Sequence, residues 1–125
     1  MNMSQNTISD FDAEELAIIN GALGQRFFRA PRVEIADSEL RLDPTSTQLV
    51  LCPAAVWVEQ GVTFIVFKTG VAKYRCLFFL GPNDQFGTGI EEFSDLKTCV
   101  TTLLQVQADY DRDNMKKLES NTNKQ

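Results

Sequence analysis

Apolar residues are densest between Leu49 and Pro82, where they form three runs of strand length. The runs read LVLCPAAVWV, VTFIVF and AKYRCLFFL, and the short segments EQG and KTG interrupt them. Apolar runs separated by glycine-containing turns are typical of a meander of antiparallel strands. Pro53 interrupts the first run, so the pattern leaves open whether Ala54–Val58 is a strand or a helical turn.

Segments on either side of the meander have apolar residues at helical spacing. In the first, Ser9 is the expected N-cap and Gly24 the expected stop. In the second, Ser94 is the expected N-cap, and the helix should run to about Tyr110 or Leu118. The apolar stripes are formed by Phe11, Leu16, Ile19 and Leu23 in the first segment, and by Leu96, Cys99, Val100, Leu103, Val106 and Tyr110 in the second.

The segment VEIADSELRLDP, between the first helix and the meander, alternates apolar and polar residues on either side of Asp37-Ser38. We therefore expect a short hairpin there. The whole pattern predicts the α+β class: an antiparallel meander sheet of about five strands, with an N-terminal and a C-terminal amphipathic helix packed on one face. Residues 9–118 should form a single domain, and the polar residues 1–8 and 119–125 should be disordered.

The last two long strands have apolar residues on both faces. A two-residue turn at Thr69-Gly70 would pair Phe67 with Ala72. One face would then carry Ile65, Phe67, Ala72, Tyr74, Cys76 and Phe78, which the two helices should cover. The other would carry Val62, Phe64, Val66, Leu77 and Phe79, with Lys68, Lys73 and Arg75 near the turn.

The sequence predicts an apolar patch of Phe64, Val66, Leu77 and Phe79 on that second face. Soluble monomers rarely leave such a patch bare. Either the Phe27-Phe28 segment or the early hairpin folds over it, or it binds a partner, and the pattern does not decide between these. Trp57 usually would be core, but it is also a candidate binding hot spot beside the polar turn Glu59–Gly61.

Composition narrows the possible functions. The 125 residues carry 17 acidic and 12 basic side chains, a net charge of −5, which opposes non-specific binding to nucleic acid or anionic membranes. Histidine is absent, which removes the commonest general base and metal ligand. We therefore expect no enzyme, no cofactor and no metal; the calcium-loop-like Asp109–Asn114 lacks the required glycine and final glutamate.

The expected location is the cytoplasm. The chain has an odd number of cysteines, Cys52, Cys76 and Cys99, and none of them forms a CxxC pair. This pattern suits a reducing compartment. The first residues show no signal-peptide pattern, and no run approaches the roughly 20 apolar residues of a spanning helix.

The segment QRFFRAPR, residues 25–32, has three arginines and no acid. Arginines interleaved with aromatics can hold an anionic ligand, and the candidates are Arg26, Phe28, Arg29 and Arg32. The favoured reading is a connector whose arginines neutralise acidic neighbours, because three arginines fall short of an electrostatic footprint.

These features together predict a non-enzymatic protein-interaction module of the adaptor, chaperone or inhibitor type. It should bind a protein partner and form a homodimer through the patch of Phe64, Val66, Leu77 and Phe79, with Trp57. The alternative is a small-ligand or anion-binding domain that uses the Arg26–Arg32 segment. An enzyme acting through carboxylates ranks last, because no pair of acids stands out.

Overall fold

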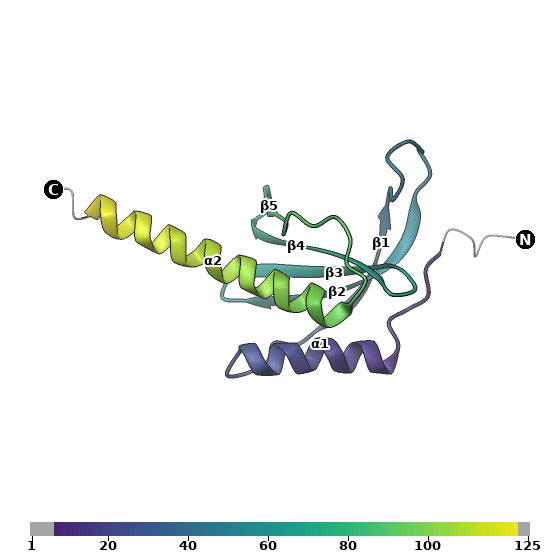
Figure 1. Ribbon diagram of the computed structural model, residues 1–125, viewed down its shortest axis with the longest axis horizontal. Coiled ribbons are helices and arrows are strands. Elements are labelled where there is room, and N and C mark those ends of the chain that lie inside the picture. Colours follow the sequence, from purple (N-terminus) through teal and green to yellow (C-terminus); the bar gives the residue numbers. More distant parts are fainter. Residues whose placement is uncertain (1–6, 123–125) are drawn as a thin grey trace, which may run out of the picture.

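The computed structural model describes the backbone of residues 7–122 and the side chains of residues 7–116. Five strands form one antiparallel sheet in the order β1-β2-β3-β4-β5, and a helix precedes and follows them (Figure 1). The elements are α1 (Ala13–Arg26), β1 (Glu34–Leu40), β2 (Val50–Glu59), β3 (Val62–Gly70), β4 (Lys73–Gly81), β5 (Asp84–Phe86) and α2 (Leu96–Thr122). The predicted α+β meander with two flanking helices is confirmed.

Helix α1 begins with a capping box rather than at Ser9. Asp12 Oδ1 accepts from the Glu15 N–H at 2.8 Å, and the Asp12 N–H donates to Glu15 Oε1 at 2.8 Å. This reciprocal pair satisfies two backbone donors, which a lone serine cap cannot do. The helix also passes Gly24 and ends at Arg26, so both predicted boundaries are wrong.

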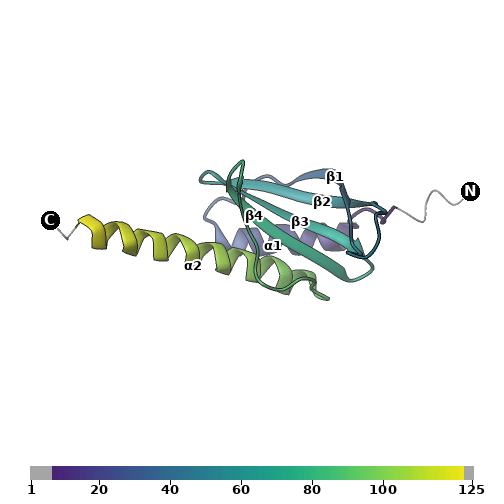
Figure 2. The ribbon, with the colours of Figure 1, turned by 90° about the horizontal axis from the view of Figure 1, so that it is seen from above.

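Helix α2 begins after Asp95, whose Oδ2 accepts from the Thr98 N–H at 2.9 Å. The predicted cap at Ser94 is therefore one residue early. The helix continues to Thr122 and extends well past the end of the sheet (Figure 2). Residues 119–122, expected to be disordered, belong to this helix. At the other end, the Ile8 N–H donates to the Leu51 carbonyl at 2.9 Å. The expectations for residues 1–6 and 123–125 lie outside the described residues.

The predicted hairpin at Asp37-Ser38 is wrong, because Glu34–Leu40 is one continuous strand. It pairs with β2 along its whole length, from Glu34 opposite Val56 to Leu40 opposite Val50. An edge strand tolerates the polar pair in its middle because most of its residues are solvent-exposed. Ala54–Val58 lies in β2, and Pro53 precedes the first residue that pairs with β3.

The turn between β3 and β4 lies at Val71-Ala72 rather than at Thr69-Gly70. As a result, Phe67 lies opposite Arg75 instead of Ala72, a displacement of three positions. Because side chains alternate between faces, an odd displacement exchanges the faces of one strand relative to the other. The predicted grouping of Phe64 and Val66 with Leu77 and Phe79 is therefore wrong.

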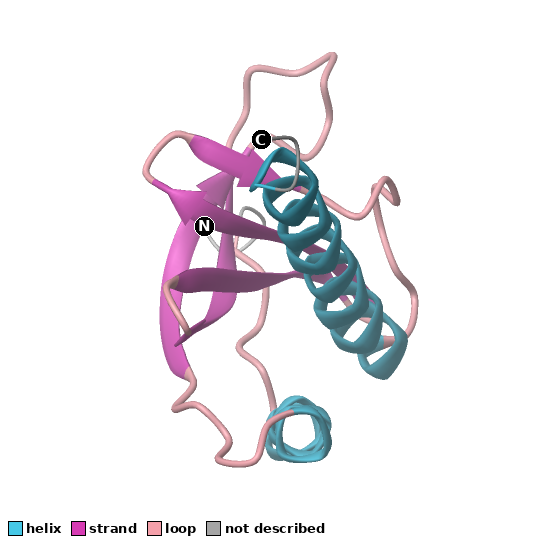
Figure 3. Ribbon diagram, turned by 90° about the vertical axis from the view of Figure 1, so that its left-hand side faces the viewer, coloured by secondary structure: helices cyan, strands magenta, loops and turns pink. Residues whose placement is uncertain are grey.

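Both helices lie on the same side of the curved sheet (Figure 3), against what we name the inner sheet face. Phe64 lies opposite Phe78 there, and Val66 lies opposite Cys76. Trp57 stacks on Phe64 with 5.5 Å between ring centroids. The side chains that pack with them include Ile19 and Leu23 of α1 and Leu96, Cys99, Val100 and Leu103 of α2. Trp57, Phe64 and Val66 are thus core residues, not surface ones.

Candidate functional site

The opposite face of the sheet carries two cross-strand rows of mainly apolar side chains. Val56, Ile65 and Leu77 lie side by side in the first row. Val58, Thr63 and Phe79 form the second row. We name the five apolar residues of these rows, Val56, Val58, Ile65, Leu77 and Phe79, the outer sheet face.

No helix covers the outer sheet face, since both pack on the inner one. The side chain of Val58 is 57% exposed, and the other four are half-buried. The Phe27-Phe28 segment, which was expected from the sequence as a possible cover, does not lie over this face. Phe28 is fully exposed, and Phe27 packs against the inner core. Strand β1 lies beside β2 in the same sheet, not over it.

Beyond these rows, the face is closed near the β3–β4 turn. Arg75 Nε lies 3.8 Å from a Glu92 carboxylate oxygen, and Nη2 donates to the Leu42 carbonyl at 3.4 Å and lies 4.0 Å from a Glu91 carboxylate oxygen. The guanidinium therefore links two loops at this end of the sheet. Phe67, in the adjacent strand, is buried there. The open part is the end away from the turn.

Lys68 was expected beside Lys73 and Arg75 on the exposed tip, but it lies on the inner face and is only 7% exposed. Its ammonium donates to Glu15 Oε1 at 2.8 Å and to the Asp10 carbonyl at 2.9 Å. Tyr74 Oη donates to the other carboxylate oxygen of Glu15. This buried network fixes the first turn of α1 on β3 and β4.

The protonation of this network follows from its contacts. Burial acts to raise the pKa of Glu15, but hydrogen bonds from Lys68, Tyr74 and the Asp12 N–H, with the Lys68 charge, hold that pKa below its ordinary value of 4.5. Burial raises the pKa of Tyr74, and so do the hydrogen bond and negative charge of Glu15. The network is therefore a carboxylate, an ammonium and a neutral phenol.

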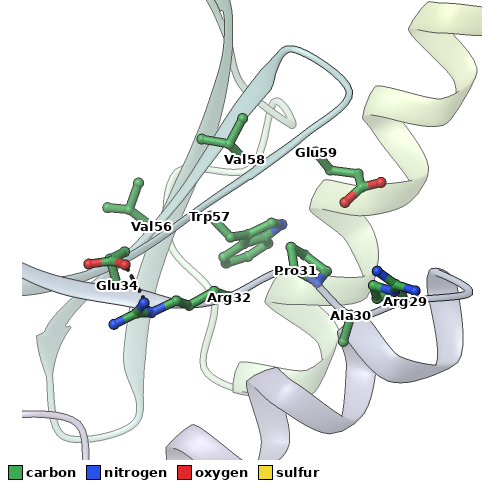
Figure 4. Close-up of a pocket in the computed structure, with 9 residues that line it drawn as sticks. All are labelled: Arg29, Ala30, Pro31, Arg32, Glu34, Val56, Trp57, Val58 and Glu59. Carbon is green, nitrogen blue, oxygen red and sulfur yellow. Dashed lines mark ion pairs between the residues drawn. The ribbon is translucent and has the colours of Figure 1, made fainter.

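A second feature lies at the sheet edge. Pairing between β1 and β2 stops at Glu34 opposite Val56, so Trp57–Glu59 has no partner on the β1 side. The connector from α1 passes this gap and leaves a cavity of about 560 Å³, which we name the edge notch (Figure 4). Its lining consists of Arg29, Ala30, Pro31, Arg32, Glu34 and Val56–Glu59.

The edge notch brings together two of the four predicted anion-binding residues, Arg29 and Arg32. Arg26 lies elsewhere, with its guanidinium 5.7 Å from the Phe27 ring centroid, and Phe28 projects fully into solvent. Trp57 lines the notch with Arg29 and Arg32, whereas the sequence analysis had assigned it to the partner surface and not to the anion site. Trp57 reaches this site because the pairing of β1 with β2 ends just before it. The alternation of apolar and polar residues does not show where the pairing of two strands ends.

Donors in the edge notch are unequally satisfied. Arg32 Nε lies 3.2 Å from a carboxylate oxygen of Glu34. The indole nitrogen of Trp57, by contrast, is buried and has no hydrogen-bond partner in the described part of the chain. Arg29 forms no ion pair or hydrogen bond with any other described residue. An unpaired buried donor is rare and points to a group that can accept from it.

No family model, no curated protein and no solved structure matches this chain. Among the described residues, no three His, Cys, Asp or Glu side chains are grouped so that they could hold a metal ion. Neither described helix combines the length and apolar composition needed to cross a membrane.

Proposed function

We propose that this protein is a non-enzymatic interaction module that buries its outer sheet face against another protein surface, in the first instance a second copy of the same chain. The observation that carries the proposal is the pair of cross-strand rows that place Val56, Ile65 and Leu77 beside Val58 and Phe79. Contiguous apolar surface of this kind marks interaction sites in soluble proteins.

The chemistry of the face favours a second copy. A twofold contact needs a surface that is complementary to itself, and an uncharged, mainly apolar patch meets that condition without matched charges. Polar residues border the rows, with Glu34 next to Val56 and Gln85 next to Phe79. An apolar centre with a polar rim is the usual anatomy of a protein interface.

The test is the mass of the protein in solution, measured by size-exclusion chromatography with light scattering. We expect twice the 14.0 kDa mass of the chain for the wild type. Ile65→Asp, in the middle of a row, should give the single-chain mass, because it buries an unpaired carboxylate in the contact. Ile35→Asp is the matched control, since Ile35 is exposed and lies opposite Ala55 on the inner side of the edge strand.

The outcomes separate the parts of the proposal. A wild type that stays a single chain up to the highest attainable concentration overturns self-association. A dimer that survives Ile65→Asp assigns the contact to a surface other than the outer sheet face. The folded state of each variant is checked by circular dichroism before its mass is interpreted.

A further inference from the structure

We propose that the edge notch binds a small molecule through a carboxylate group, which accepts from the Trp57 indole N–H and the Arg29 guanidinium. The lining of the notch shares Val56 and Val58 with the outer sheet face, but the two proposed donors, Trp57 and Arg29, lie outside both rows of that face. Three observations on the described residues carry the inference: an unpaired buried donor, an unpaired cation and the chemistry of the surrounding walls.

The first observation is the indole nitrogen. Trp57 is only 1% exposed, and its ring is held by stacking on Phe64. The ring therefore cannot turn its N–H toward water, and Nε1 has no acceptor among the residues that the structure describes. Burying a donor without a partner costs free energy, so a ligand oxygen at this point restores a hydrogen bond that the fold itself leaves unmade.

The second observation is the charge of Arg29. Of the three arginines in residues 25–32, Arg32 is paired with Glu34 and Arg26 lies over the Phe27 ring. Arg29 is left without a partner among the described residues, although it lines the notch. Its planar guanidinium can donate two parallel hydrogen bonds to a carboxylate.

The third observation selects the kind of anion. Glu34 and Glu59 both line the notch, and their negative charges oppose a doubly charged phosphate more than a singly charged carboxylate. Ala30 and Pro31, which lie on the same side of β2 as the indole in Figure 4, supply apolar surface for the rest of the ligand. The volume of about 560 Å³ lies within the range of small-molecule sites.

The ligand must reach a nitrogen that is covered in the free protein. Figure 4 shows the nitrogen end of the indole directed toward Pro31 and Glu59. Neither of these side chains forms a hydrogen bond or ion pair within the described part of the chain. Movement of either side chain would therefore break no hydrogen bond or ion pair between described residues.

Trp57 is the only tryptophan in the chain, so the proton–nitrogen correlation spectrum of the isotope-labelled protein contains a single indole cross-peak. The experiment titrates the full chain with isocaproate, isocaproamide, leucine and inorganic phosphate. Isocaproate should shift the indole peak saturably, because its carboxylate accepts from the N–H, whereas the neutral amide and phosphate should not. Leucine has the same carbon skeleton plus an ammonium group, which can donate a hydrogen bond to the Glu59 carboxylate. Tighter binding of leucine than of isocaproate would therefore identify an amino acid rather than a simple carboxylic acid as the natural ligand class.

Two variants locate the contact. Arg29→Gln should weaken isocaproate binding by about ten- to a hundredfold, the loss expected for a hydrogen bond to a charged group. Arg26→Gln, in the same segment but outside the notch, should leave the affinity unchanged. The proposal is overturned if no carboxylate shifts the indole peak saturably, if the amide shifts it equally, or if both variants bind as the wild type does. Neither variant changes Ile65 or another residue of the outer sheet face, so the mass measurements on Ile65→Asp test the proposed function separately, and failure here is distinguishable from failure there.

Discussion

At the scale of single residues, Lys68 shows how the alternation of side chains along a strand decides which of them are buried. Lys68 is four residues after Phe64 and two after Val66, so a strand that buries those two side chains must also bury the lysine. Burial is tolerated because Glu15 and the Asp10 carbonyl accept from the ammonium and Tyr74 donates to the carboxylate. A buried charge with all its partners is stable, but the same charge with one partner removed is not.

Lys68→Met should therefore lower the free energy of unfolding by about 3 kcal/mol, because it leaves the Glu15 carboxylate buried without its cation. The double variant Lys68→Met with Glu15→Gln should recover most of this loss, since the neutral amide oxygen can still accept from the Asp12 N–H and the amide nitrogen can donate to Tyr74 Oη. Urea unfolding of the wild type, both single variants and the double variant gives the coupling energy. An additive double variant would show that the two side chains do not interact.

The depressed pKa of Glu15 also predicts a pH dependence. Since the pKa is lower in the folded state than its ordinary value of 4.5, the unfolded chain binds the proton more readily. The contribution of Glu15 to stability is thus complete above that value and is lost as the pH falls below it toward the folded pKa. Urea midpoints measured across this range should fall more steeply for the wild type than for Glu15→Gln, and parallel curves would contradict the assignment.

At the scale of elements, the sequence predicted which segments are helices and strands better than how they are joined. Helical spacing and alternation identify α1, α2 and the long strands because each reflects one buried face. They do not specify the turn between β3 and β4, where Thr69-Gly70 has more typical turn residues than Val71-Ala72. The structure places the turn at the latter pair, and Ala72 adopts the left-handed conformation with φ of 53°.

A left-handed alanine is strained, because its Cβ crowds the backbone. Ala72→Gly should therefore raise the free energy of unfolding by about 0.5–1 kcal/mol, as glycine adopts this conformation without strain. Val71→Gly is the control: a glycine placed in the same turn at a residue without positive φ should lower stability. Chemical denaturation of both variants checks this, and a loss of stability in Ala72→Gly would contradict the observed turn.

At the scale of the whole molecule, the predicted architecture is correct, but only some of the residues predicted for the uncovered apolar patch lie on the uncovered face. Two amphipathic helices and strands with two apolar faces leave one face uncovered whatever the register, so that part of the argument did not depend on the turn. Which residues lie on the uncovered face did depend on it. Leu77 and Phe79 are there as expected, whereas Phe64 and Val66 are replaced by Ile65, with Val56 and Val58 from β2.

If two copies bury this face, the stability of the protein must depend on its concentration, because dissociation accompanies unfolding. The thermal unfolding midpoint of the wild type should rise by roughly 5 °C over a hundredfold increase in concentration, as mass action requires for a dimer of this size. Ile65→Asp should show no such rise, and Ile35→Asp should follow the wild type. A midpoint independent of concentration in all three proteins would mean that the outer sheet face stays open to solvent in the free protein, which would restrict the interaction to a different partner.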